Sequence, residues 1–263
     1  MSLAGTTYGE HGPRVVLLHG LFGQGRNFTG VARALAGEAR VTLVDLPDHG
    51  RSPWSDDFSY PGMADRVADF LAASAPGERW TVVGHSMGGK VAMLVALRRP
   101  ELVERLCVVD VAPVPTAAVS SFGTYVDAMR QVDLDTLTDR AAADAVVAAR
   151  VPDRAVRGFL LQNLRRDGTG EQARWRWQMN LALLGDRLPE IADWPGGDLA
   201  PYAGPVLWLA GVDSDYVQPA YAPAMRALFP RVRLVRVKNA GHWVHADQPE
   251  VFVASLRRFL AAS

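Results

Sequence analysis

The sequence predicts an α/β fold with a mostly parallel central sheet, helices on both of its faces and one inserted helical segment. Short β-branched, apolar runs alternate with helical patterns, as in βαβ units. Most of these runs are continuously apolar, as expected for strands that are buried on both faces. The 263 residues fit one large domain of this kind or two small ones. We expect strands at 15–18, 41–44, 80–83, 106–109, 206–209 and 232–237.

Helical patterns separate these strands and follow the last one. We expect helices at about 27–36, 62–74, 88–99, 220–229 and 249–261. In the C-terminal pattern, four apolar side chains fall at i, i+4, i+7 and i+8, which places them on one helix face. This stripe consists of Phe252, Leu256, Phe259 and Leu260.

The alternation stops between residues 112 and 200, where we find only helical patterns. The apolar stripes there consist of Phe122, Tyr125, Val126 and Met129, then of Val156, Phe159, Leu160 and Asn163, and then of Trp175, Met179 and Leu183 with Trp177, Leu181 and Leu184 beside them. A helical insertion between two parallel strands lies at the carboxyl edge of the sheet, where such sheets bind ligands. We therefore expect a core domain of residues 1–111 and 201–263, and an all-helical lid of residues 112–200.

The charge balance limits the classes of partner. Lys and Arg together number 28, as do Asp and Glu, so nothing favours nucleic acid or an anionic membrane as a partner. No apolar run approaches the ~18 residues of a membrane span, and the polar N-terminal residues lack the pattern of a signal peptide.

The single cysteine, Cys107, lies in an apolar run and is expected to be buried and free of disulfides. We expect a cytoplasmic protein, monomeric or weakly self-associating.

The most informative motif is G-H-S-M-G-G at residues 84–89, between a predicted strand and a predicted helix. A strand that enters a helix through a tight turn around G-x-S-x-G is typical of a nucleophile elbow. Side chains at positions 84 and 88 would collide with the neighbouring strand and helix, so glycine is needed there. We expect Ser86 to be a nucleophile. The backbone N–H of Met87, at a helix N-terminus, is expected to stabilise an oxyanion.

A histidine late in the chain can serve as the base for Ser86. His242 follows the last predicted strand, and the ordinary pKa of histidine lies near neutral pH. In folds with this elbow the serine comes first in the chain, the acid second and the histidine last. Gly241 is expected to let the loop turn the imidazole toward Ser86. The alternative base is His245.

The same loop has a spacing that resembles a set of metal ligands, formed by His242, His245 and Asp247. Because no further Cys or His cluster lies nearby, we expect no metal here, and acyl transfer by a serine and a histidine requires no cofactor. Instead we expect His245 and Asp247 to help start the C-terminal helix, with Asp247 as the N-cap ahead of Pro249.

Two loops follow the first two predicted strands. In the first, H-G-L-F-G at residues 19–23, we assign the backbone N–H of Leu21 as the second oxyanion donor and His19 as a structural side chain. The second loop, residues 45–52, has the composition of a turn held by side-chain hydrogen bonds. Structural roles are expected for Asp45, His49 and Ser52.

The acid that would orient His242 has two candidate positions. Asp110 ends the apolar run 106–109, and Asp213 or Asp215 follows the next predicted strand. Neighbouring parallel strands lie ~4.8 Å apart, so a carboxylate at either end could reach the same imidazole. Asp110 could also be a cap or loop contact at the start of the lid.

Taken together, these motifs resemble the α/β-hydrolase superfamily over nearly the whole chain. Within it, the likeness is greatest to YbfF-type esterases and their mitochondrial abhydrolase-domain relatives. The segments that carry the resemblance are 19–23, 84–90, 99–105, 109–114 and 239–247.

The resemblance bears on the choice of acid. Most superfamily members carry it three residues after the glycine that ends the penultimate strand; counting from Gly211, that position here is Ser214. The YbfF-type group shares this serine and carries its acid after the preceding strand, in an Asp-hydrophobic-Ala/Ser-Pro motif that Asp110 matches. The resemblance therefore favours Asp110 over Asp213, with Ser214 forming a hydrogen bond near His242.

This pattern predicts a serine hydrolase that acts on a small acyl substrate. Ser86 would attack, His242 would move the proton, Asp110 would hold the imidazole, and the amides of Leu21 and Met87 would bind the oxyanion. Thioester hydrolysis, C–C bond cleavage and perhydrolysis are alternatives on the same site. A ligand-sensing protein with slow turnover is an alternative from another class.

Apolar side chains of the lid outnumber those needed to pack its helices together, so some are expected to face Ser86 and to select the substrate. Asn163 and Asn180 are polar candidates for this pocket, although a place on the helix surface is as compatible with the sequence. The full set of expected substrate contacts is Phe22, Phe122, Phe159, Asn163, Trp177, Asn180, Ser214 and Trp243.

Overall fold

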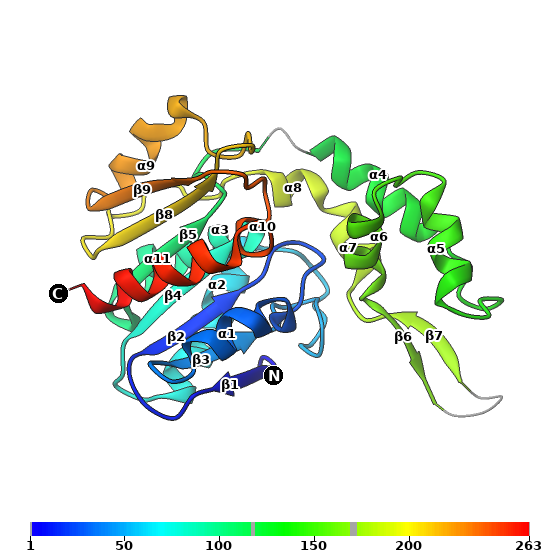
Figure 1. Cartoon of the computed structure of the whole chain (residues 1–263), viewed down its shortest axis with the longest axis horizontal. Helices are drawn as coiled ribbons and strands as arrows, with labels where there is room; N and C mark the ends of the chain where they lie inside the picture. The colour runs from blue at the N-terminus through cyan, green and yellow to red at the C-terminus, as the bar shows by residue number, and fades with distance from the viewer. Residues whose placement is uncertain (1, 117–118, 169–172, 263) are drawn as a thin grey trace.

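The computed structural model describes residues 2–116, 119–168 and 173–262. Its main feature is a seven-stranded sheet in the order β1-β3-β2-β4-β5-β8-β9 (Figure 1). β1 pairs with β3 in antiparallel fashion, and the other neighbours are parallel. The strands are β1 (Gly5–Tyr8), β2 (Arg14–Leu18), β3 (Arg40–Val44), β4 (Trp80–His85), β5 (Val103–Val109), β8 (Val206–Gly211) and β9 (Val232–Val237).

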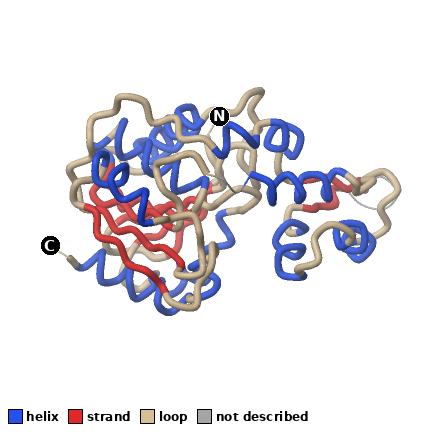
Figure 2. Tube along the Cα trace, turned by 90° about the horizontal axis from the view of Figure 1, so that it is seen from above, coloured by secondary structure: helices blue, strands red, loops and turns tan. Residues whose placement is uncertain are grey.

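Helices cover both faces of this sheet (Figure 2). Alternate strand residues point to opposite faces, so Val15 and Leu17 join one apolar cluster, while Val16 and Leu18 join the other. The first cluster also holds Cys107, which is buried as expected, and the side chains of α1 (Thr29–Leu35) and α11 (Pro249–Ala261). The second holds those of α2 (Tyr60–Ser74), α3 (Met87–Arg98) and α9 (Ala222–Leu228). The prediction of a mostly parallel sheet with helices on both faces is confirmed.

Helix α3 lies deepest and fixes the position of the residue before it. Its residues from Met87 to Leu97 are all buried, and it packs against β2, β4 and β5. A helix that is apolar on every side is stable only inside a core. Ser86, the N-cap residue of α3, is therefore held between a buried strand and a buried helix.

The N-terminal strand β1 was not predicted from the sequence. Its residues Gly5, Thr6 and Thr7 are exposed and Tyr8 is half-buried, because β1 is an edge strand that pairs only with β3. An edge strand with a solvated face carries no continuous apolar run. The pattern that revealed the central strands was therefore absent here.

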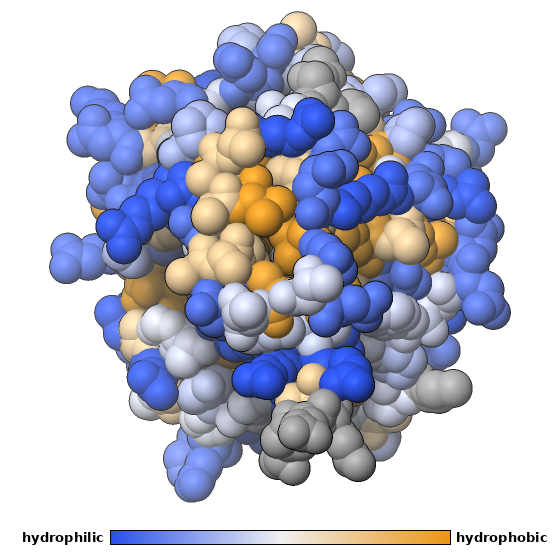
Figure 3. All heavy atoms as spheres, turned by 90° about the vertical axis from the view of Figure 1, so that its right-hand side faces the viewer, coloured by the Kyte–Doolittle hydropathy of each residue, from blue (hydrophilic) through white to orange (hydrophobic). Residues whose placement is uncertain are grey.

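The chain leaves the sheet after β5 and returns to it at β8. The intervening segment extends to the right of the sheet in Figure 1. Figure 3, which faces that end, shows apolar side chains gathered among hydrophilic ones. The elements are α4 (Val119–Arg130), α5 (Arg140–Ala148), α6 (Arg154–Leu161), β6 (Leu164–Asp167), β7 (Arg174–Trp177), α7 (Leu181–Asp186) and α8 (Leu188–Ala192).

The expectation that this segment is all-helical is corrected by the β6–β7 pair, a two-stranded antiparallel sheet with Leu164 opposite Trp177. The sequence of β7, R-W-R-W, alternates with period two, which is the period of a strand. The helical stripe expected from Trp175, Met179 and Leu183, with Trp177 beside it, is therefore wrong for both tryptophans, which lie in β7. Only α7, which begins at Leu181, is helical in that region.

Within the described part of the chain, no helix is both long enough and apolar enough to cross a membrane.

Candidate active site

Ser86 occupies a sharp turn between β4 and α3. Its backbone has φ 53° and ψ −119°, a strained left-handed conformation for a residue with a side chain. A Cβ at position 84 would lie 2.1 Å from the carbonyl oxygen of Gly88, and a Cβ at position 88 would lie 2.4 Å from that of His19. The expected steric need for glycine at both positions is confirmed.

A line of hydrogen bonds connects Ser86, His242 and Asp110. The Ser86 hydroxyl lies 2.9 Å from Nε2 of His242, and Nδ1 of that ring lies 2.8 Å from Oδ2 of Asp110. The carboxylate accepts a hydrogen bond from the Nδ1–H group, which leaves Nε2 as the acceptor that faces the hydroxyl. This is the arrangement that a base needs in order to take a proton from Ser86.

The Asp110 carboxylate is fully buried and has three donors. Besides His242, the backbone N–H of Gly211 donates to Oδ1 at 3.0 Å, and the Ser214 hydroxyl donates to Oδ2. Burying a charge is costly unless hydrogen bonds compensate it, and these donors supply that compensation. The expected hydrogen bond of Ser214 near His242 is confirmed, because its hydroxyl donates to the carboxylate that holds the imidazole. The expectation that Ser214 contacts substrate is corrected by the same bond, which occupies the hydroxyl.

The alternative acid, Asp213, lies on the surface beyond the end of β8. Its side chain is exposed, and its backbone N–H donates to the carbonyl of Ala240 at 3.0 Å. Among the described residues, the carboxylate that contacts the His242 ring is that of Asp110. The strand β5 ends at Val109, so Asp110 lies directly at the sheet edge, whereas β8 ends two residues before Asp213.

Three contacts fix the loop of His242. The His85 ring donates from Nε2 to the backbone carbonyl of His242 at 2.8 Å, and the Gly241 N–H donates to Asp247 at 2.8 Å. On the other side, the Tyr216 ring stacks on the imidazole with centroids 3.8 Å apart and an interplanar angle of 18°. Burial raises the pKa of Tyr216 to about 12, so its phenol stays neutral. Tyr216 was not predicted, because no sequence pattern joins it to His242.

Two expectations about this loop are corrected. Asp247 does not cap α11, because Gln248 precedes that helix without a side-chain cap, and the Asp247 carboxylate instead accepts the Gly241 N–H. Glycine is also not sterically required at 241, where the nearest atom to a Cβ would be the carboxylate, at 3.6 Å. Among the described residues, no group of three His, Cys, Asp or Glu side chains is placed to hold a metal ion.

His245, the alternative base, is packed among aromatic rings, and the hydrogen bond to Ser86 comes from His242 instead. The His245 ring packs 4.4 Å from the centroid of Phe28 and 4.9 Å from that of His85. Burial lowers the pKa of His245 to about 3 and lowers the pKa of His85 well below its usual range. Both rings are therefore neutral at neutral pH, and His242 is the histidine that contacts Ser86.

Two buried histidines shape the loop after β2. His19 donates from Nδ1 to the carbonyl of Gly20 at 2.8 Å and accepts the Leu46 N–H on Nε2 at 3.0 Å. His49 accepts the Phe22 N–H at 3.2 Å, which holds Phe22 at a positive φ of 61°. Both side chains have the structural role that the sequence predicted. Together they place Leu21 of this loop beside Ser86.

The loop of residues 45–52 is held by side-chain hydrogen bonds, as expected. The Asp45 carboxylate accepts the N–H groups of Gly25 and Arg51 at 2.7 and 2.9 Å, and the Ser52 hydroxyl donates to the Asp45 carbonyl at 2.5 Å. These bonds hold the core loop that faces the inserted segment.

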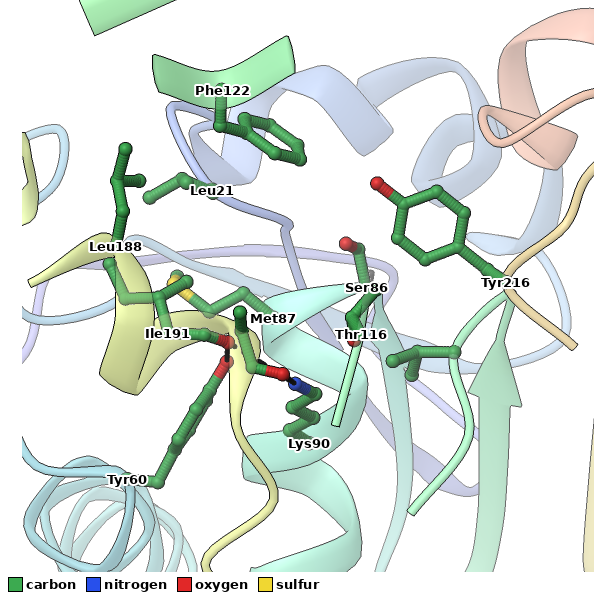
Figure 4. A pocket seen from close by; sticks show the side chains of 12 residues that line it. Leu21, Tyr60, Ser86, Met87, Lys90, Thr116, Phe122, Leu188, Ile191 and Tyr216 are labelled. Atoms are coloured by element: carbon green, nitrogen blue, oxygen red, sulfur yellow. Dashed lines mark hydrogen bonds between the residues drawn. The ribbon is translucent and has the colours of Figure 1, made fainter. Parts of the chain in front are cut away.

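Two cavities adjoin Ser86. The first, about 40 Å³, is lined by Ser86, Leu21 and Met87, with Phe122 above and α8 at the opposite end (Figure 4). In the part of the chain that the structure describes, the amides of Leu21 and Met87 donate to no protein acceptor. The second cavity is lined by Ser86 and His242 and by aromatic side chains, among them Phe159 of the inserted segment and Trp243.

A family model described as "alpha/beta hydrolase fold" matches residues 13–249 of the chain. The chain belongs to the α/β-hydrolase fold family. The sn-1-specific diacylglycerol lipase ABHD11 of Mus musculus is 41% identical over 255 residues, which cover 95% of this chain and 81% of that protein. The esterase YbfF of Escherichia coli strain K12 is 32% identical over 94% of this chain and 92% of its own.

A solved structure, a "Marine microorganism esterase", superposes on this hydrolase with a TM-score of 0.94 at 32% identity, covering 98% of this chain and 99% of that one. These comparisons confirm the resemblance to α/β hydrolases, and to the YbfF-type group in particular, that the motifs suggested.

Not every expected substrate contact lies at the cavities of this α/β hydrolase. Phe122, Phe159 and Trp243 line at least one cavity beside Ser86. Phe22 lines neither cavity and is fully buried, with its ring 6.1 Å from that of Phe122. Trp177 is buried in the inserted segment opposite Leu164 of β6.

Asn163 and Asn180 have structural partners in the hydrolase core. The buried Asn163 side chain donates to the carbonyl of Phe22 at 2.7 Å and accepts from Gln24 at 2.6 Å. Asn180 donates from its side chain to Asp48 at 3.0 Å and from its backbone to the Asp48 carbonyl at 2.8 Å. Because these bonds occupy the amides, both residues connect the insertion to core loops instead of facing a substrate.

A buried lysine holds α8 against the first cavity. The Lys90 ammonium donates to the carbonyls of Ile191, Ala192 and Asp193 at 3.2, 2.7 and 2.7 Å. The Tyr60 hydroxyl also donates to Ile191, at 2.7 Å (Figure 4). Burial lowers the pKa of Lys90 to about 8, so the ammonium is the main form at neutral pH. It thus satisfies the last carbonyls of α8, where positive charge is favoured.

Proposed function

We propose that this α/β hydrolase cleaves carboxylic esters with Ser86 as nucleophile, His242 as base and Asp110 as the residue that orients His242. The observation that carries the proposal is the hydrogen-bonded line from Asp110 through His242 to Ser86, with separations of 2.8 and 2.9 Å. The line ends at a strained elbow beside a cavity. The names of the esterase and lipase relatives agree with this chemistry.

In the first half-reaction, the Ser86 oxygen attacks the ester carbonyl carbon while its proton passes to Nε2 of His242. The carbonyl oxygen becomes an oxyanion, which the amides of Leu21 and Met87 are placed to stabilise. His242 then gives its proton to the alcohol oxygen as the C–O bond breaks. The products are a free alcohol and an acyl group on Ser86.

In the second half-reaction, water replaces the alcohol. His242 takes a proton from the water as it attacks the acyl carbon, and the proton then returns to the Ser86 oxygen as the acid leaves. The buried Asp110 carboxylate stabilises the imidazolium in both half-reactions without itself accepting a proton.

We further infer that residues 112–200 act as a lid over this chemistry. Phe122 from α4, and Leu188 and Ile191 from α8, line the first cavity opposite Ser86. Phe159 from α6 lines the second cavity. The insertion therefore supplies much of the apolar wall around the nucleophile, whereas the core supplies the reacting groups.

Steady-state hydrolysis of p-nitrophenyl acetate by a Ser86→Ala variant tests the proposal. We expect kcat to fall by about 10⁴-fold or more, because the covalent step is lost, while circular dichroism shows an unchanged fold. Ser74→Ala, at an exposed position on α2, is the matched control and should retain activity. A folded Ser86→Ala enzyme with more than about a tenth of the wild-type activity would overturn the proposal.

A further inference from the structure

The two cavities at Ser86 differ in which catalytic groups they expose. The first is lined by Ser86 and by both residues whose amides we propose to bind the oxyanion, Leu21 and Met87, and its lining does not include His242. The second is lined by Ser86, Leu21 and His242. Both cavities therefore reach the nucleophile Ser86, but only the second reaches His242, which donates the proton.

The position of His242 determines which cavity receives the acyl chain of an ester and which receives its alcohol. When the tetrahedral intermediate collapses, the proton on Nε2 of His242 must reach the alcohol oxygen, so the alcohol has to lie on the His242 side. The acyl carbon is bonded to Ser86 at that moment, and its chain must point away from His242. The first cavity therefore receives the acyl chain, and the second receives the alcohol.

The two sides differ in the space that adjoins them. The acyl side holds about 40 Å³ and is closed at its end by α8, which leaves space for only about three water-sized groups. The second cavity itself holds about 20 Å³, but its lining residues Asn27, Phe159, Trp243 and His245 also line a third cavity of about 460 Å³ between α6 and residues 243–247. The rings of Phe159 and Trp243 lie 6.0 Å apart and form an aromatic wall along this path.

Helix α8, which closes the first cavity on the side opposite Ser86, is held in place by hydrogen bonds. Tyr60, Leu188 and Ile191 lie across the cavity from Ser86 (Figure 4). The Lys90 ammonium and the Tyr60 hydroxyl bind the carbonyls at the end of α8, so this helix cannot move outward without breaking four hydrogen bonds. A long acyl chain would have to displace this end.

From this asymmetry we propose that the substrate is an ester of a short acyl group, of about two to four carbons, with a bulky, largely apolar alcohol. The size limit is the room at the acyl end. The preference rests on the proposed ester hydrolysis at Ser86 and adds the substrate class. Ile191 and Leu188 set the acyl length, and Phe159 sets the preference for the alcohol.

Two ester series, measured as kcat/KM on the full chain, test this assignment. The first varies the acyl group of p-nitrophenyl esters from acetate to octanoate. The second compares ethyl acetate with 2-(1-naphthyl)ethyl acetate, whose alkoxides are similar leaving groups but differ in bulk. We expect the wild-type enzyme to lose about tenfold or more from butyrate to octanoate, and to favour the naphthylethyl ester by about tenfold, as loss or gain of apolar contact of this size implies.

Variants on the two sides make the test specific. Ile191→Ala should raise the octanoate-to-acetate ratio about tenfold and leave the ratio of the two alcohols unchanged. Phe159→Ala should lower the naphthylethyl-to-ethyl ratio about tenfold and leave the acyl ratio unchanged. Leu188→Ala is a second truncation at the acyl end, should Ile191→Ala fail to fold.

The outcomes separate the two proposals. Equal activity on acetate and octanoate, or an Ile191→Ala variant that changes only the alcohol ratio, would overturn the assignment of the cavities and leave ester hydrolysis intact. Absence of turnover with every ester in a folded enzyme would contradict the proposed function, and the assignment would fall with it.

Discussion

Ser86 and Asp110 both have a positive backbone φ, of 53° and 50°. A non-glycine residue in this region costs about 1–3 kcal/mol, and such residues gather at functional sites. They follow neighbouring parallel strands, β4 and β5, at the same edge of the sheet. The turn after each strand directs a side chain toward His242, and the buried packing on both sides holds the strained conformation.

Exchange of the two candidate acids for amides tests the role of Asp110. Asp110→Asn should keep the fold but lower kcat by about 10⁴-fold, because an amide can hold His242 in the wrong tautomer. Asp213→Asn should change kcat less than twofold, since the Asp213 carboxylate lies at the surface. The measurement compares kcat for p-nitrophenyl acetate hydrolysis between the two variants. A larger loss in the Asp213 variant would place the acid after β8.

Single residues could be predicted from the sequence where the chemistry or the backbone requires one amino-acid type within a short, contiguous motif. Ser86, Gly84 and Gly88 form a motif because strand, turn and helix are contiguous there. Tyr216, which stacks on His242, could not be found in this way, because the contact depends on two separate loops meeting. The same holds for Asn163, whose partners lie about 140 positions away in the sequence.

At the level of elements, polar side chains attach the inserted segment to the core. Asn163 and Asn180 bind the loops at Phe22 and Asp48, and Lys90 of α3 binds the end of α8. Apolar contacts can slide, but buried hydrogen bonds have a fixed geometry. These hydrogen bonds therefore determine where the elements of the inserted segment lie relative to Ser86.

Replacing Lys90 tests the anchor of α8. Lys90→Met has a side chain of similar length but removes three hydrogen bonds to the end of α8, so we expect the unfolding free energy to fall by about 2 kcal/mol or more. Urea unfolding at neutral pH measures this difference. Lys238→Met, at an exposed position, is the matched control and should change stability by less than about 0.5 kcal/mol. Equal stability of both variants would mean that Lys90 does not hold α8.

Elements were predictable where burial left a periodic pattern. The central strands β2 to β5 and β8 showed continuous apolar runs because helices cover both of their faces. The edge strand β1 and the β6–β7 pair have exposed residues and no such run. In β7, tryptophans two positions apart also fitted a helical spacing when read with Met179, which lies outside any strand or helix.

For the whole molecule, buried histidines make stability depend on pH. Burial lowers the pKa of His49 and of His245 to about 3, against an ordinary value of 6.5. Below pH 6.5 the unfolded chain binds protons at these positions and the folded chain does not, so stability is lost as the pH falls from 6.5 toward 3. Each histidine can contribute up to about 1.4 kcal/mol per pH unit in this window.

The unfolding free energy measured by urea at pH 7, 6, 5 and 4 tests this dependence. His49→Gln should reduce the slope below pH 6.5 by as much as about 1 kcal/mol per pH unit, because the titrating group is gone. His11→Gln, at an exposed position, should leave the slope unchanged. If the slopes of wild type and His49→Gln coincide, the buried histidines do not produce the acid sensitivity.

The central claim for the molecule is that its sheet brings Ser86, His242 and Asp110 together as one reacting unit. A fluorophosphonate tests this directly, because an activated serine attacks its phosphorus and water does not readily release the adduct. We expect peptide mass spectrometry to find one adduct, on Ser86, in proportion to the loss of ester hydrolysis, and none in Ser86→Ala. Full ester hydrolysis by enzyme whose Ser86 is completely modified, or inhibition with the adduct on another residue, would contradict the account.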